Sequence, residues 1–132
     1  MKHDELDEFA AKPIKYFSHD TNASDDIKCR RLIKRGGWAA YGRWWRLCEV
    51  LGRIDGHALK IANDDDLDIA ADYLQFDSVS DMVEFFELLR NVGLIEPDAE
   101  FVYSKRMFSN AMQASARKRG AAKTNAKRWG EK

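Results

Sequence analysis

The segment YFSHDTNASDD, residues 16–26, places a histidine beside an aspartate and follows them with hydroxyl, amide and carboxylate side chains. A histidine held by a carboxylate is the arrangement that general-base catalysis uses. However, His19 and Asp20 are neighbours in the sequence, and adjacent side chains rarely point at one another. Asn22 or Ser24 suits the N-cap of a helix, because its side-chain oxygen accepts from backbone N–H groups in the first turn. The pattern therefore favours a helix start over a catalytic pair.

No other group of residues indicates an enzyme or a metal site. The run NDDDLD, residues 63–68, is rich in carboxylates but lacks the loop glycine and the distal glutamate of an EF-hand. We interpret it as a helix cap, Asn63 or Asp64, followed by an acidic first turn. Cys29 and Cys48 show no CxxC spacing, so we expect two reduced, partly buried thiols. We expect no catalytic activity, no cofactor and no metal.

The charges are balanced in number and segregated in sequence. The chain has 22 basic and 22 acidic residues in 132, and its formal net charge is zero. Residues 23–62 hold nine basic and four acidic residues, residues 63–104 hold one and twelve, and residues 105–132 hold nine and one. A basic–acidic–basic order of this kind favours a polyanion as the partner of one surface.

The basic segments supply the candidate DNA contacts. These are Arg30, Arg31, Lys34 and Arg35 in a first helix, Arg43 and Arg46 in a second, and Arg117, Lys118, Arg119, Lys123, Lys127 and Arg128 near the C-terminus. Trp129 is a candidate for stacking on an unpaired base. The adjacent Trp44 and Trp45 allow the same interpretation, but their spacing with Leu47 favours anchoring in the core.

Periodicity and turn residues predict a mainly helical chain with short strands. We expect helices over about 24–35, 38–53, 64–76, 81–92 and 105–118, and strands over 58–61, 94–96 and 100–104. Gly36-Gly37 ends the first helix, and Ser80 is the expected N-cap of the fourth. This order predicts a winged helix-turn-helix with an extra N-terminal helix and a C-terminal helix.

The chain divides into three predicted parts. Residues 1–13 form a polar lead-in, residues 14–119 the winged-helix domain, and residues 120–132 a basic tail that is expected to be disordered. The N-terminus is acidic and lacks an apolar core segment, so we expect no signal peptide. No apolar run approaches the ~20 residues that span a bilayer, so we expect a cytoplasmic protein without membrane contact.

Residues 14–119 also resemble a known family. The shared features are the aromatic-His-Asp start, the helix DDIKCRRLIKRGG, the run YGRWWRLCEVL, and the later segments DGHALKI and MVEFFELLRNVGLIE. They are similar to the Lin1244/Lin1753-like N-terminal domains, which accompany replication proteins of phages and mobile elements. These domains resemble replisome-organiser and DnaD-type N-terminal domains. The resemblance implies a winged-helix fold and a role in initiating DNA replication, without catalysis.

Two functions follow from these observations. The first is a DNA-binding or scaffolding module that contacts phosphates of duplex or single-stranded DNA through the basic helices and tail. The second is an interaction module without DNA contact, which assembles as a homo-oligomer or binds a helicase or a helicase loader. The presumptive recognition helix, residues 81–92, carries Asp81, Glu84 and Glu87 against a single Arg90. Three carboxylates oppose insertion between phosphates, so we expect binding through other surfaces.

Overall fold

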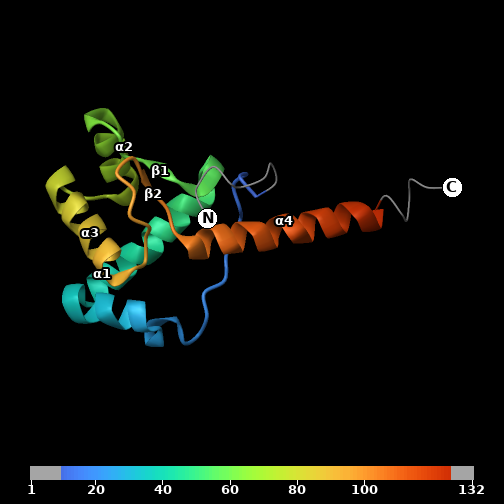
Figure 1. The fold of residues 1–132 in the computed structure, drawn as a ribbon, viewed down its shortest axis with the longest axis horizontal. Helices are drawn as coiled ribbons and strands as arrows, with labels where there is room; N and C mark the ends of the chain where they lie inside the picture. The colour runs from blue at the N-terminus through green and yellow to red at the C-terminus, as the bar shows by residue number, and fades with distance from the viewer. Residues whose placement is uncertain (1–9, 126–132) are drawn as a thin grey trace.

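The computed structural model describes residues 10–125 of the chain, and the side chains of residues 10–116. Within these residues the fold is mainly helical, with four helices and a small two-stranded antiparallel sheet. The elements are α1 (Ile27–Arg53), β1 (Leu59–Lys60), α2 (Asp64–Leu74), α3 (Val79–Val92), β2 (Phe101–Val102) and α4 (Lys105–Asn125). Figure 1 shows α1, α2 and α3 gathered at one end of the molecule, with the later turns of α4 extending away from them.

Helix α1 consists of two halves on either side of a break. Gly37 has φ 77° and ψ −178°, which is far from helical backbone. The break confirms the predicted stop at Gly36-Gly37. The expected caps Asn22 and Ser24 were wrong, because Ala23–Asp25 forms a separate 3₁₀ turn. Asp26 caps α1 instead, and its carboxylate accepts from the backbone N–H groups of Lys28 and Cys29.

The core lies between the second half of α1 and the pair α2 and α3. The second half buries one stripe of α1, which comprises Ala40, Trp44, Leu47, Cys48, Val50 and Leu51. Helix α3 adds Met82, Phe85, Phe86 and Leu89, and α2 adds Ala70, Ala71 and Leu74. Each large apolar side chain buried in this way contributes about 1.5–3 kcal/mol relative to exposure. The core therefore holds the C-terminal half of α1 in place.

Two N-caps start α2 and α3. The Asn63 side chain accepts from the backbone N–H of Asp66 at 2.8 Å, as predicted for the acidic run. Ser78 accepts from the N–H of Asp81 at 3.1 Å, so the predicted cap Ser80 was two residues late. The turn before α3 therefore lies two residues earlier than expected, because Gln75 already ends α2 in a left-handed conformation.

The sheet is smaller than predicted. Strands β1 and β2 pair antiparallel, with Leu59 opposite Val102. The strand predicted at 94–96 was wrong: Ile95 is buried in the core without strand structure, although the N–H of Glu96 donates to the carbonyl of Tyr103 at 3.0 Å. The following residue is Pro97, which has no N–H to extend a ladder.

A buried histidine fastens the segment before α1 to the end of that helix. The His57 ring is completely buried, with its nitrogens 2.7 Å from the carbonyl oxygens of Leu51 and Ala10. The N–H of Ile14 donates to the carbonyl of Gly52 at 2.9 Å. The described start of the chain therefore lies along the C-terminal turns of α1.

Helix α4 is longer than the sequence predicted. It continues past Lys118 and Gly120 to Asn125, since a single glycine costs only ~1 kcal/mol in a helix and Ala121 and Ala122 favour one. Residues 1–9 of the predicted lead-in and residues 126–132 of the predicted tail lie outside the described part. The division into three parts stays a prediction. No helix in the described part has the length and apolarity that crossing a membrane requires.

The two glycines of α1 give opposite predictions for the stability of the fold. Gly37→Ala should lower the free energy of unfolding by about 1–3 kcal/mol, because the backbone there suits only glycine. Gly42→Ala is the matched control, since a Cβ at this helical position meets no atom within 4 Å. It should raise the free energy of unfolding by about 0.5–1 kcal/mol. Urea unfolding measures both, and equal effects would contradict the break.

Candidate nucleic-acid interface

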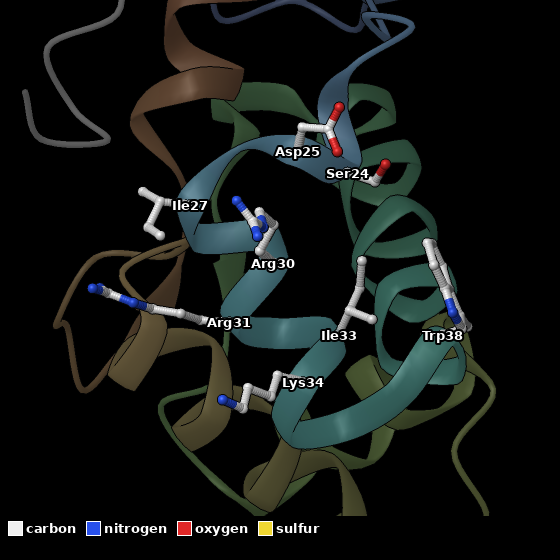
Figure 2. Close-up of a pocket in the computed structure, with 8 residues that line it drawn as sticks. All are labelled: Ser24, Asp25, Ile27, Arg30, Arg31, Ile33, Lys34 and Trp38. Atoms are coloured by element: carbon white, nitrogen blue, oxygen red, sulfur yellow. The ribbon is translucent and has the colours of Figure 1, made fainter.

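Three of the predicted cations meet at one hollow. Arg30 lies four residues before Lys34 and Arg31 three, so both arginines neighbour Lys34 on the surface of the first half of α1. They line an open hollow of about 570 Å³. Figure 2 shows Arg31 and Lys34 on one side of the helix, with Ile33 and Trp38 on the other and Arg30 between them. All three cations line this hollow, which we call the α1 hollow.

The rest of the α1 hollow is mostly apolar and includes one carboxylate. Its other lining residues are Ser24, Asp25, Ile27, Ile33 and Trp38. The Trp38 side chain is 67% exposed and Ile27 is 56% exposed. Trp38 meets the Tyr41 ring edge to face, with centroids 5.6 Å apart. The hollow thus combines cations with an exposed aromatic ring, and Asp25 is its one carboxylate.

The cations of the hollow have no ionic partner inside the part of the chain that the structure describes. No carboxylate oxygen there lies within 4.0 Å of a charged nitrogen of Arg30, Arg31 or Lys34. Ion pairs do form elsewhere, as between Arg90 and Glu87 at 2.9 Å. Because these three charges are not neutralised by direct pairs, they can meet an anion from outside.

Arg35 lies on the same half of α1 and is exposed, but it does not line the hollow. Arg43 and Arg46 are placed differently, because both contact their own protein. The Arg43 guanidinium lies 4.0 Å from the centroid of the Phe76 ring. Arg46 donates to the carbonyl of Tyr73 and pairs with Glu49 at 3.3 Å. The structure therefore does not bring these two arginines to the hollow.

The C-terminal candidates fall largely outside the description. Arg117, Lys118, Arg119 and Lys123 lie on the backbone of α4, but their side chains are not among those described, and Lys127 and Arg128 lie beyond the described residues. At the start of α4, Lys105 and Arg106 line a second hollow with Lys28. Asp26 and Glu96 also line it, so its charge is mixed.

The adjacent tryptophans belong to the packing of the protein. Trp44 is 1% exposed. The Trp45 ring is covered by His19, whose ring centroid lies 3.7 Å away at an interplanar angle of 12°. Arg106 lies 5.3 Å from the Trp45 centroid on the side of α4. Core anchoring is thus confirmed for Trp44. His19 packs on a ring and makes no hydrogen bond or ion pair to Asp20, although both are described.

Trp38 was missed as a functional residue, and the sequence held one signal for it. It directly follows Gly36-Gly37 and precedes the buried stripe that begins at Ala40. A tryptophan at the edge of a break, beside a basic helix, is a candidate for exposure. The direction in which the chain turns at Gly37 decides whether it faces the cations.

The acidic character of α3 persists in the structure. Asp81, Val83, Glu84 and Glu87 are all exposed. Glu87 pairs with Arg90, the single basic residue of this helix. The outward surface of α3 therefore presents carboxylates to any approaching molecule.

The described residues hold no metal-binding cluster, and their two cysteines are buried. No cluster of three or more histidine, cysteine, aspartate or glutamate side chains is placed there to hold a metal ion. Cys29 and Cys48 are free and buried. Burial raises the pKa of the Cys48 thiol to about 12 and also raises the pKa of the Cys29 thiol. Both thiols are therefore protonated, and poor nucleophiles, at neutral pH.

The comparison with known families decides where the chain belongs. A family model described as Lin1244/Lin1753-like, N-terminal, matches residues 16–109. The chain belongs to this family. The match spans the elements from the start of α1 through β2 and reaches the first turns of α4, so the α1 hollow lies inside the Lin1244/Lin1753-like domain. No curated protein and no solved structure matches the chain.

The raised pKa of the Cys48 thiol predicts how the free energy of unfolding depends on pH in the alkaline range. An unfolded thiol ionises near pH 9.0, whereas Cys48 in the folded state ionises near 12. Between these values the unfolded state binds fewer protons, so the free energy of unfolding should fall as the pH rises. Urea unfolding at about pH 8 and about pH 10.5 measures the fall. The Cys48→Ala variant should show a smaller one, and an equal fall in both proteins would contradict the assignment to Cys48.

Proposed function

We propose that this domain is a DNA-binding module of a replication-initiation protein from a phage or mobile element, without a catalytic step of its own. The observation that carries the proposal is the α1 hollow, where Arg30, Arg31 and Lys34 gather without a carboxylate within 4.0 Å among the described residues. Phosphates supply the sequence-independent part of DNA affinity and pair with cations of this kind. Membership of the Lin1244/Lin1753-like family supports a replication role through the resemblance noted above.

The proposed fold type is a winged helix-turn-helix that docks in an unusual way. Helices α2 and α3, with a short turn between them, supply the helix-turn-helix part, and the β1–β2 pair supplies a minimal wing. In the usual docking mode α3 enters the major groove. Here α3 exposes Asp81, Glu84 and Glu87, and these carboxylates face phosphates unfavourably. DNA therefore binds along α1. The six C-terminal cations remain candidate phosphate contacts in addition to those of α1.

The first prediction for this function concerns salt. Each phosphate neutralised on duplex DNA adds about −0.9 to the slope of log affinity against log salt concentration. The double variant Arg30→Ala, Lys34→Ala should therefore bind a DNA duplex more weakly. Its slope should be shallower by the amount that roughly two phosphate contacts contribute. Fluorescence anisotropy of a labelled duplex over a salt series measures both quantities.

A matched control removes the same charge from elsewhere on the surface. Lys15 and Lys60 are exposed and do not line the α1 hollow. The double variant Lys15→Ala, Lys60→Ala should keep the slope of the unaltered protein. If both double variants lose the same slope, net charge explains the binding and the hollow does not.

A second candidate function is assembly, and the surface of α2 favours it. Ile69 and Tyr73 lie four residues apart on α2 and are 53% and 50% exposed. Exposed Asp68 and Asp72 lie on the same helix. An acidic surface with exposed apolar side chains fits a partner that is basic and apolar. That partner is a basic helix of another copy, or a helicase or helicase loader.

The self-association version predicts a mass that depends on salt. At low salt the protein should sediment as more than one 15.2 kDa chain, and at high salt it should return to the monomer, because screening weakens the charge contacts. Replacing Tyr73 by serine should reduce the low-salt association, whereas replacing Tyr16, which lies on the N-terminal segment, should not. Sedimentation velocity measures the mass, and a monomer at every salt concentration excludes self-association.

A further inference from the structure

We infer that the α1 hollow binds single-stranded DNA, with Trp38 stacking on an unpaired base while Arg30 and Lys34 contact the phosphates beside it. This inference rests on the proposed DNA-binding function and specifies its substrate. It starts from an aromatic ring that the fold leaves exposed. Trp38 is 67% exposed, whereas Trp44 is 1% exposed and Trp45 is covered by the rings around it.

The surroundings of Trp38 match the chemistry of a nucleotide. A base needs an apolar face, and the Trp38 ring with Ile33 beside it supplies one. The phosphates need cations, and Arg30 and Lys34 line the same hollow. The hollow, at about 570 Å³, lies within the ~300–1,000 Å³ range of ligand-binding clefts.

The Trp38 ring contacts the Tyr41 ring and leaves most of its surface exposed. Its contact with Tyr41 is nearly perpendicular, with an interplanar angle of 84°. An edge-to-face partner engages at most one face of an aromatic ring. The ring therefore keeps a face that can accept a flat base.

Duplex DNA satisfies only the phosphate contacts of this site, for a geometric reason. In a duplex each base already lies between its neighbours, and freeing one face costs a few kcal/mol of unstacking. A single strand offers unstacked bases at much lower cost, and stacking on aromatic side chains is how sequence-independent single-strand binders hold it. Phosphate contacts alone would not distinguish the two, so Trp38 is the residue that sets the preference.

The test compares single-stranded and duplex DNA with three variants. The probes are a fluorescein-labelled oligothymidylate of about 15 nucleotides and a labelled duplex of the same length. The variants are Trp38→Ala, the conservative Trp38→Phe, and Tyr16→Ala as a control. Tyr16 is an aromatic residue that is 75% exposed and lies outside the α1 hollow. Thermal unfolding followed by circular dichroism verifies that each variant is folded.

Trp38→Ala should weaken oligothymidylate binding by about 5- to 150-fold, the factor that one lost stacked base represents. It should leave duplex affinity and both salt slopes unchanged, because a stacking contact releases no counterions. Trp38→Phe should restore part of the affinity, and Tyr16→Ala should match the unaltered protein.

Four results would overturn the inference. Equal losses on both probes, or no loss on the oligothymidylate, would show that Trp38 does not read unpaired bases. A Trp38→Ala variant that changes only the sedimenting mass would assign the hollow to contact between copies of the chain. After equal losses on both probes, or no loss on the oligothymidylate, the proposed function still stands if the unaltered protein binds the duplex in a salt-dependent manner. In that case this inference alone fails. An unaltered protein that binds neither probe removes both.

Discussion

The backbone at Gly37 is the constraint on which the arrangement of the site depends. In an unbroken helix Trp38 would stand one turn after Lys34 and continue a single outward stripe of α1. With φ 77° and ψ −178° at Gly37, the chain leaves the helix and restarts it, so that the two halves run in different directions. Trp38 then lines the same hollow as Ile33 and Arg30. The core fixes the second half of α1, and the break decides how the basic half is presented.

The charges of this chain differ in whether they have a partner within the fold. Carboxylates of α2 and α3 serve the fold: Asp66 accepts from the N–H of Ala62, and Glu87 pairs with Arg90. In the described part the cations of the α1 hollow serve no comparable contact. At physiological salt, charges more than ~8 Å apart hardly act on one another. A chain with zero net charge can therefore present a locally cationic hollow, and local charge, not the total, governs how a polyanion meets this surface.

Local rules predicted much of the helical framework. The break at Gly36-Gly37 and the Asn63 cap follow from single residues whose preferences are strong. Predictions failed where the outcome depended on contacts with distant residues. Ile95 enters the core instead of a strand, and the Ser78 cap displaces Ser80 because α2 ends early at Gln75.

The candidate site was predictable in part for the same reason. The spacing of Arg30, Arg31 and Lys34 is enough to make both arginines neighbours of Lys34 on a helix, because it follows the helical repeat. The exclusion of Arg43 and Arg46 was not predictable, since it rests on Phe76 and Tyr73 from another part of the chain. Nor was the position of Trp38, because glycine accepts several backbone conformations and the sequence does not select one.

The two proposed activities support each other energetically. Three cations and one stacked base give a single domain only modest affinity, and its cationic part weakens as salt rises. Copies joined through the α2 surface and a basic surface other than the first half of α1 would place several α1 hollows on one strand. Binding of the second hollow is then intramolecular, and linked sites of this kind exceed the affinity of either alone by orders of magnitude. A weak hollow on an associating domain therefore favours DNA that is exposed over a length of several sites, which is the form that an opened replication origin presents.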